Sequence, residues 1–308
     1  MTSNILVLGA GELGTAVLTS LASKAPSAAK ITVLLRPSTI SSSSPSKQQE
    51  IRNLESLGIS ILPGDIATSS TPTLSQLFKS YDLIISCLGF ASGPGSQLKI
   101  ARAVLDAGVK RYLPWQFGVD YDVIGRGSAQ TLFDEQLDVR DLLRGQSGTE
   151  WIIISTGMFT SFLFEGYFGV VDLEYGGGKG IVRALGSWEN KVTLTTPEDI
   201  GKLTAAIVFE SKPPFKNEVV FTAGETISYG KVVDLVDEVM EKKVEREVWT
   251  VPALKEDLAK DPENPIAKYR VVFAEGKGCY WDKEGTFNAK NGIEVEDVRG
   301  WMVKNLKK

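Results

Sequence analysis

The chain has 308 residues, of which 43% are hydrophobic and 23% are charged. These fractions are ordinary for a folded globular protein, and the length suits one large domain or two modest ones. The 34 basic and 38 acidic residues give a net charge of −4, and no block of basic residues occurs. We therefore expect no nucleic acid and no membrane among its partners.

The absence of histidine narrows the chemistry further. It excludes Ser-His-Asp and Cys-His catalysis, His-ligated metals and any imidazole acid or base. The two cysteines, Cys87 and Cys279, are too few for a zinc site, so we predict reduced structural thiols and no metal. Nowhere do about 18 apolar residues run uninterrupted, and no charged leader precedes the first apolar run, which indicates a cytoplasmic protein.

Residues 5–14 carry the strongest single signal. An apolar run ends at Gly9 and a helical pattern follows, so that Gly9, Gly11 and Gly14 form G-x-G-x-x-G between a buried strand and a helix. In this motif the glycines permit a tight turn, a close approach of backbone to a pyrophosphate, and close packing of helix on strand. We interpret residues 9–14, with Glu12 and Leu13 opening the helix, as a dinucleotide-binding turn; the alternative is a purely structural glycine turn.

The second predicted strand, residues 31–35, ends at Arg36. NAD enzymes carry an acidic residue here that binds the ribose 2′-hydroxyl, whereas arginine suits a 2′-phosphate. The pattern therefore favours NADP over NAD, the alternative being an arginine that only closes a strand. Residues 38–49 are rich in Ser and Gln and predict a mobile loop, in which Lys47 is either a phosphate contact or a solvated side chain.

Further strands and helices alternate along the chain. Gly89 and Phe90 follow the fourth strand, at the carboxyl edge where open α/β sheets bind ligands. The alternation of strands and helices predicts a doubly wound parallel α/β (Rossmann) sheet. We expect residues 1–156 to form the NADP-binding domain, with residues 192–224 returning to it. Residues 157–308 are expected to form mainly a smaller C-terminal substrate-binding lobe. The remaining strands are expected at residues 59–62, 83–88, 111–114, 151–155 and 219–221, and helices at 97–107, 128–144 and 229–242.

Several motifs together resemble the NmrA-like, isoflavone-reductase-like group of atypical short-chain dehydrogenases, which includes the phenylcoumaran benzylic ether reductases. The resemblance covers nearly the whole chain, and residues 116–122 look like the fungal branch. It rests on residues 9–14, Arg36, 107–111, 114–118 and 197–201.

This resemblance implies NADPH and hydride transfer to an aromatic or polyketide-like molecule, such as a carbonyl, enone, imine or benzylic ether, in secondary metabolism. The protein would be a monomer or homodimer. Further cofactor contacts are expected from Gly89, Phe90, Trp115, Gln116, Phe117, Thr156, Met158 and Phe159. Met158 and Phe159 would pack on the nicotinamide ring or simply fill the core, and residues 162–168 supply aromatic side chains for a flat substrate or for packing between lobes.

The family lysine is missing. Plant reductases of this group carry it in a Phe-x-x-Lys pattern, and here the stretch from Phe133 places Gln136 at that position. An amide does not donate a proton at neutral pH, although it can hydrogen-bond ribose or a substrate carbonyl. A non-catalytic NADP-binding regulator of the NmrA type is therefore the alternative function.

Other side chains near the fifth and sixth predicted strands can donate a proton. Tyr121 is the most plausible acid or orienting hydroxyl, because a phenol is neutral and can donate, whereas Asp120 and Asp122 are expected to be solvated. A Tyr-x-x-x-Lys match at residues 175–179 contains three glycines and predicts a loop rather than a catalytic helix. The charged residues of 134–144 are expected to form i,i+4 pairs on a surface.

Overall fold

The computed structural model describes residues 3–89 and 93–307. The chain forms two compact units, each built from three segments. Unit 1 comprises Met1–Gln116, Glu135–Ile154 and Pro197–Val220, and unit 2 comprises Phe117–Asp134, Ser155–Thr196 and Phe221–Lys308. Within the described residues every helix is too short or too polar to span a bilayer. The division of labour expected from the sequence, a cofactor domain and a substrate lobe, stays a prediction.

Unit 1 contains a seven-stranded sheet made of β1 (Asn4–Leu8), β2 (Lys30–Leu35), β3 (Ser60–Pro63), β4 (Leu83–Ser86), β5 (Arg111–Leu113), β6 (Glu150–Ser155) and β11 (Glu218–Phe221). The strand order is β11-β6-β5-β4-β1-β2-β3. β1 pairs in parallel with both β2 and β4, and parallel pairing continues to β3 on one side and through β5 to β6 on the other. This order is that of a doubly wound α/β sheet, so the predicted fold class is confirmed.

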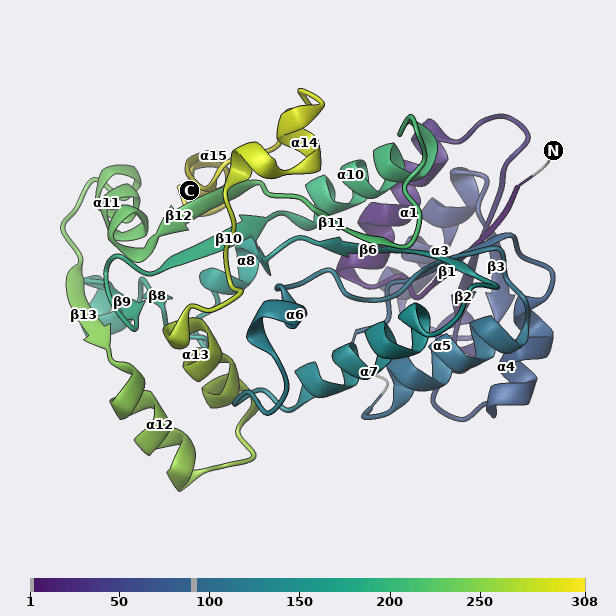
Figure 1. The fold of residues 1–308 in the computed structure, drawn as a ribbon. Helices are drawn as coiled ribbons and strands as arrows, with labels where there is room; N and C mark the ends of the chain where they lie inside the picture. The colour runs from purple at the N-terminus through teal and green to yellow at the C-terminus, as the bar shows by residue number, and fades with distance from the viewer. Residues whose placement is uncertain (1–2, 90–92, 308) are drawn as a thin grey trace. The chain divides into compact units, whose positions relative to one another are not determined.

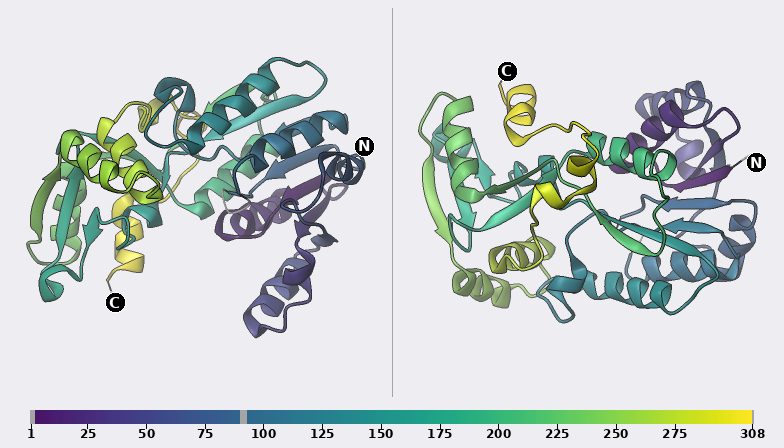
Figure 2. Two further views of the ribbon diagram at one scale, coloured as in Figure 1. Left: turned by 90° about the horizontal axis from the view of Figure 1, so that it is seen from below. Right: turned by 45° about the horizontal axis from the view of Figure 1, so that its top comes forward.

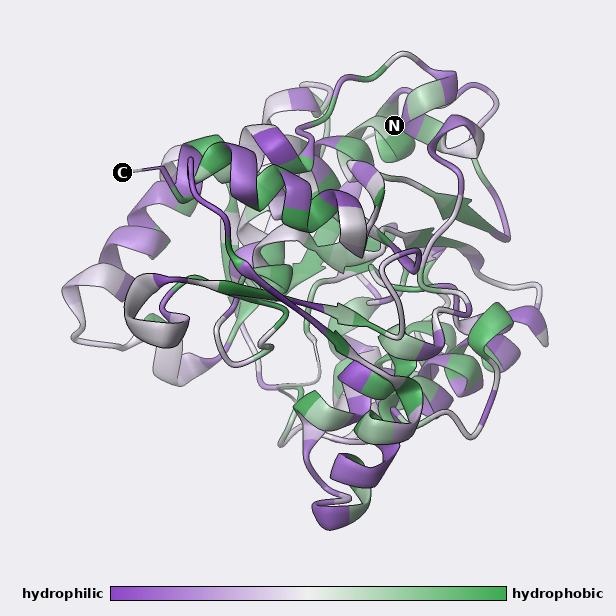
Figure 3. Ribbon diagram, turned by 90° about the vertical axis from the view of Figure 1, so that its left-hand side faces the viewer, coloured by the Kyte–Doolittle hydropathy of each residue, from purple (hydrophilic) through white to green (hydrophobic). Residues whose placement is uncertain are grey.

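Helices cover both faces of this sheet (Figure 1). The helices in this part of the chain are α1 (Glu12–Lys24), α2 (Pro37–Ile40), α3 (Pro45–Ser56), α4 (Thr71–Phe78), α5 (Ser96–Asp106), α7 (Leu132–Arg144) and α10 (Pro197–Phe209). In Figure 1, α1 and α10 lie on one face, and α4, α5 and α7 lie on the other. Figure 3 shows hydrophobic and hydrophilic residues alternating around the helices, the pattern expected of helices that bury one face.

The core beneath α4, α5 and α7 is built from alternate strand residues. Leu6, Leu8, Ile84, Tyr112 and Ile153 are fully buried in one cluster with the inner faces of these helices. Because side chains alternate across a strand, their neighbours in sequence point to the opposite face. Strands that are buried on both faces appear in the sequence as continuous apolar runs, which is why their positions could be predicted.

A small residue brings α10 against α1. A Cβ at Gly201 would lie 2.4 Å from the carbonyl oxygen of Ala16, so the two helices approach closely only because this position is glycine. α1 is thereby held on the sheet with its N-terminus at the carboxyl end of β1.

The expected mobile loop at residues 38–49 is wrong in part. Residues 38–40 belong to α2 and residues 45–49 belong to α3, and each of these helices has a proline in its first turn. Only Leu54 of α3 is buried, and in the left view of Figure 2 this helix stands clear of the rest of unit 1. The polar sequence therefore reflects an exposed helix rather than an irregular loop.

Unit 2 contains two three-stranded sheets, ordered β12-β10-β7 and β13-β9-β8. Their strands are β7 (Met158–Phe159), β8 (Val171–Asp172), β9 (Ile181–Leu185), β10 (Lys191–Thr195), β12 (Glu225–Ser228) and β13 (Glu245–Trp249). Around them lie α6 (Tyr121–Ile124), α8 (Thr160–Leu163), α9 (Tyr175–Gly178), α11 (Tyr229–Val239), α12 (Val251–Lys260), α13 (Pro265–Glu275), the 3-10 helix η2 (Lys283–Gly285), α14 (Phe287–Lys290) and α15 (Val298–Asn305).

Candidate functional site

The glycine motif forms a turn that no other residue type would allow. Gly9 has φ of +90°, in the region that favours glycine. A Cβ at Gly14 would lie 2.3 Å from the carbonyl oxygen of Gly9, so the helix meets the strand at a distance that leaves no room for a side chain. At Gly11 a Cβ would meet nothing within 4 Å, so this position faces open space.

The N-terminus of α1 is directed into that space. Its N-cap residue is Gly11, which has no side chain with which to cap the first turn. The helix has 13 residues, and its first N–H groups carry the positive end of the helix dipole. Helix N-termini of this kind bind phosphate groups. A side chain at position 11 would occupy the space that the phosphate needs.

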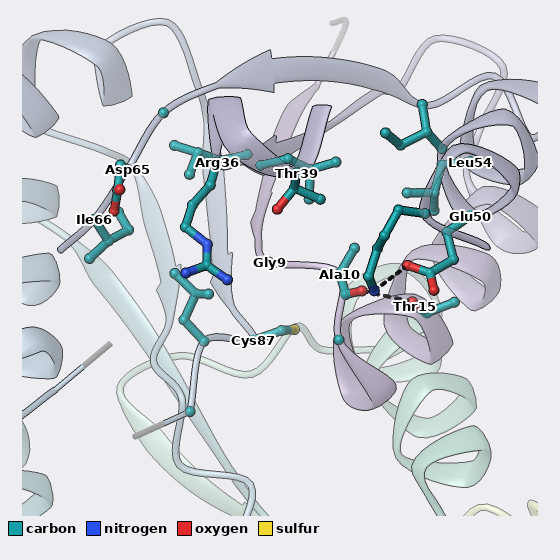
Figure 4. Close-up of a pocket in the computed structure, with 18 of the residues that line it drawn as sticks. Gly9, Ala10, Thr15, Arg36, Thr39, Glu50, Leu54, Asp65, Ile66 and Cys87 are labelled. Atoms are coloured by element: carbon teal, nitrogen blue, oxygen red, sulfur yellow. Dashed lines mark hydrogen bonds and ion pairs between the residues drawn. The ribbon is translucent and has the colours of Figure 1, made fainter. Parts of the chain in front are cut away.

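A cavity of about 430 Å³ opens beside this turn (Figure 4). It lies entirely within unit 1 and reaches the ends of β1, β2, β3 and β4 and the inner side of α3. Its lining includes Gly9, Ala10, Gly11, Thr15, Leu35, Arg36, Thr39, Lys47, Glu50, Leu54, Asp65, Ile66, Cys87, Leu88 and Gly89. Figure 4 shows Arg36 across the cavity from Thr15.

Two cations and two carboxylates, Glu50 and Asp65, line the cavity. Arg36 directly follows β2 and lines the cavity, as does Lys47 of α3. The Nζ of Lys47 lies 2.7 Å from a carboxylate oxygen of Glu50, and both side chains are about half exposed. The open glycine turn and Arg36 fit the pyrophosphate and the 2′-phosphate of NADPH respectively.

Trp115 and Gln97 fix the wall of the cavity that follows β4. A Cβ at Gly89 would lie 3.2 Å from the indole ring of Trp115, which therefore packs against the backbone there. The buried Gln97 donates from Nε2 to the carbonyl oxygens of Leu88 at 2.7 Å and Gly89 at 3.4 Å. Phe90, which was expected to contact cofactor, lies outside the described residues.

Gln116 and Gln136 belong to one buried network. Gln116 Nε2 donates to the backbone carbonyl of Gln136 at 2.8 Å, and Arg140 Nε donates to Gln116 Oε1 at 2.8 Å. All three side chains are fully buried. Within the described residues, neither side-chain polar atom of Gln136 has a hydrogen-bond partner. A buried amide in that state costs about 1–3 kcal/mol per unsatisfied group, which points to a ligand or water at this position.

The predicted i,i+4 ion pairs on the surface of α7 are wrong for two residues, Glu135 and Arg140. Arg140 is fully buried and donates to Gln116. Glu135 accepts from backbone N–H groups at the start of α5. Both side chains bind partners that are distant in sequence, which the i,i+4 rule does not reveal.

The remaining expected site residues lie in unit 2. The N–H groups of Thr156 and Gly157 both donate at 3.0 Å to the carbonyl oxygen of Gly118. Phe117, Tyr121, Thr156 and Met158 are buried, and Phe159 is partly buried. The Tyr121 ring packs edge-on against Phe133 with 5.0 Å between centroids.

An aromatic cluster in unit 2 joins Tyr121 to the segment that follows β6. Phe133 lies 5.8 Å from Tyr269, which lies 6.0 Å from Phe162, and Phe162 lies 4.7 Å from Phe168. Burial raises the pKa of the Tyr269 phenol well above its usual value, so this tyrosine stays neutral. The cluster explains the dense aromatic pattern of residues 162–168.

The Tyr-x-x-x-Lys match does not form the helix that ordinary short-chain dehydrogenases use. Gly176 and Gly177 have φ of +61° and +70°, so the segment from Tyr175 to Lys179 is a left-handed turn. The backbone angles agree with the prediction that this match does not lie on a regular helix. Sequence reasoning missed Thr15, Glu50, Asp65 and Cys87 as cavity residues, although Asp65 follows β3 at the sheet edge where ligands bind.

Comparisons with known proteins agree with this arrangement. A model of the NmrA-like family matches residues 1–295, so the chain belongs to that family. An NmrA-like family domain-containing oxidoreductase of Gibberella moniliformis is 52% identical, covering 98% of both chains. A phenylcoumaran benzylic ether reductase of Populus trichocarpa is 27% identical, covering 97% of this chain and 94% of its own.

A solved structure shows the same fold. The binary complex of leucoanthocyanidin reductase with NADPH from Vitis vinifera has a TM-score of 0.80 at 20% identity, covering 99% of this chain and 100% of that one. The family model and the 52% identical relative confirm the family resemblance inferred from the motifs.

Proposed function

We propose that this protein is an NADPH-dependent reductase of a small aromatic or polyketide-like molecule carrying a carbonyl, enone, imine or benzylic ether. The observation that carries the proposal is the cavity of unit 1, which runs from the uncapped start of α1 to Arg36. Support comes from the 52% identical relative, which is named an oxidoreductase, and from the leucoanthocyanidin reductase complex, which contains NADPH.

In this proposal the backbone of the glycine turn, opening into Glu12 and Leu13, holds the pyrophosphate. Gly9 and Gly14 allow the turn to form, and Gly11 leaves space beside it for the pyrophosphate. Arg36 binds the 2′-phosphate. Gly89 and the indole of Trp115 form the wall that leads away from the phosphates. When bound, the cofactor supplies the hydride.

Gln136 is proposed to hold a polar group of the ligand. Its amide is buried, its backbone carbonyl is fixed by Gln116, and its two side-chain polar atoms lack partners within the described residues. An amide orients a carbonyl or hydroxyl but does not release a proton at neutral pH. We therefore assign the acid to the Tyr121 phenol or to a water or substrate hydroxyl.

Unit 2 is proposed as the substrate-binding lobe, with Phe117, Thr156, Met158 and Phe159 contacting the nicotinamide end. Phe162 and Tyr167, whose ring centroids lie 5.8 Å apart and which are not fully buried, support this assignment, because aromatic rings favour flat apolar ligands. The protein is proposed to act in the cytoplasm in secondary metabolism, as a monomer or homodimer.

Calorimetric titration with NADPH and with NADH tests the cofactor assignment. We expect NADPH to bind at least about tenfold more tightly, a difference of roughly 1.4 kcal/mol. Incubation with a panel of aromatic carbonyls, enones, imines and benzylic ethers should then consume the near-ultraviolet absorbance of NADPH. If NADPH does not bind, the proposal fails.

A non-catalytic regulator that binds NADP is the second candidate, and Gln136 is the observation that favours it. Such a protein would bind both redox forms equally and reduce no member of the panel. Gln136→Lys separates the two functions, since it restores the proton donor of the plant reductases. Activity in the variant with none in the wild type would support the regulator.

A further inference from the structure

Glu135 of α7 caps a different helix. Its Oε2 accepts from the backbone N–H of Gly95 at 2.9 Å, and its Oε1 accepts from Gln97 at 2.8 Å and Leu98 at 3.1 Å. Three N–H groups thus converge on one carboxylate. Such charge-assisted bonds at a helix N-terminus are among the stronger hydrogen bonds in proteins.

This arrangement compensates for a missing local cap. The N-cap of α5 is Gly95, which has φ of +79° and no side chain. Within the described residues, seven other helices are capped by their own N-cap side chains, which are Ser70, Asp120, Ser228, Thr250, Asn264, Thr286 and Asp297. In α5 the acceptor comes instead from a residue 40 positions beyond the N-cap. The start of α5 is therefore located by α7 and not by its own loop.

The start of α5 in turn locates a wall of the cavity. Gln97 lies in its first turn and donates to the carbonyl oxygens of Leu88 and Gly89, both of which line the cavity. A displacement of this turn would move Gln97 and the backbone that it holds. The path from Glu135 to the cavity thus consists of hydrogen bonds and one helical turn, all within unit 1.

Glu135 also directly precedes Gln136 on α7. The carbonyl of Gln136 is held by Gln116. The turn of α7 that presents the Gln136 amide is therefore restrained from two directions, by Gln116 and by the N-terminus of α5.

We infer that Glu135 is a positioning residue for the cofactor site, acting through Gln97 on the Leu88–Gly89 wall. The inference rests on the proposed function, because it assumes that the cavity binds NADPH. Loss of the Glu135 carboxylate should therefore weaken NADPH binding more than the loss of a comparable helix cap elsewhere in unit 1.

Glu135→Gln tests this role, because glutamine keeps the shape but loses the charge and one acceptor oxygen. We expect the Kd for NADPH, measured by calorimetry, to rise about fivefold or more. Ser70→Ala is the matched control, since it removes the side-chain cap of α4 in the same unit and Ser70 does not line the cavity. It should lower the melting temperature comparably and leave the Kd unchanged. Equal Kd values for the two variants would overturn the inference.

Gln97→Met provides an independent test if the Glu135 variant does not fold. It breaks the link to Leu88 and Gly89 and leaves the cap intact, so the Kd should rise in the same direction. In the double variant the two effects should be less than additive, because both act along one path. Full additivity, or an unchanged Kd in Gln97→Met, would contradict the path. Absence of NADPH binding to the wild type would instead refute the proposed function.

Discussion

The Lys47 ammonium lies 2.7 Å from the Glu50 carboxylate, and both side chains line the cavity that also contains Arg36. An exposed ion pair of this kind is worth about 0–1 kcal/mol, so a phosphate can readily displace the carboxylate from the lysine. Glu50 nevertheless opposes an anionic ligand through like-charge repulsion and by occupying Lys47.

Glu50→Gln should therefore strengthen the binding of NADPH. We expect a two- to fivefold lower Kd, equivalent to about 0.4–1 kcal/mol, at low ionic strength, with the gain shrinking as salt is added. Calorimetry with NADPH and NADH measures the effect, and NADH should respond less because it lacks the 2′-phosphate. In a Lys47→Met background the gain should diminish. An unchanged Kd for NADPH at low salt would exclude this role of Glu50.

Substitutions at Gly11 and Gly14 should have different effects, the first on NADPH binding and the second on the stability of the fold. A Cβ at Gly11 would meet nothing within 4 Å, so we expect Gly11→Val to keep a melting temperature close to that of the wild type while NADPH binding is lost. Gly14→Ala forces a Cβ to within 2.3 Å of the Gly9 carbonyl oxygen and should cost about 1–3 kcal/mol of stability. Thermal unfolding and NADPH titration of both variants check the pair. Tight binding by Gly11→Val would refute the position of the pyrophosphate.

The difference between local and distant contacts explains what the sequence could predict. The glycine turn and Arg36 follow from motifs within a few residues, because strand, turn and helix are consecutive there. The partners of Gln116 and Glu135 lie 20 and 40 residues away, and only the parallel sheet brings them together. A charged helix face therefore reads as solvated until its neighbours are known, which is why the buried Arg140 was misassigned.

Replacement of Gln136 by leucine distinguishes a ligand contact from a structural residue. Because both polar atoms of this amide lack partners within the described residues, an apolar side chain of similar size should leave the melting temperature unchanged or raise it. Turnover of an accepted substrate should fall, since the ligand loses its polar contact. Thermal unfolding and steady-state kinetics measure the two effects. A clear loss of stability would show that the amide serves the fold instead.

Asp237 should make the stability of unit 2 depend on pH. Burial of this side chain favours the neutral form, yet its pKa is lowered, because the backbone N–H of Val244 and the cations Lys243 and Arg246 stabilise the carboxylate. Since the folded pKa lies below the unfolded one, the contribution to stability is complete above about pH 4 and is lost as the pH falls through the folded pKa.

Asp237→Asn should consequently destabilise the protein by about 1–2 kcal/mol at pH 7 and by less at pH 3, where the wild type has begun to lose the same contribution. Urea unfolding at the two pH values measures the difference. Asp234→Asn is the control, because Asp234 is 57% exposed and binds Arg246 at 3.1 Å on the surface, where an ion pair contributes little. If the two variants lost equal stability at pH 7, the buried carboxylate would not be the link between α11 and the start of β13.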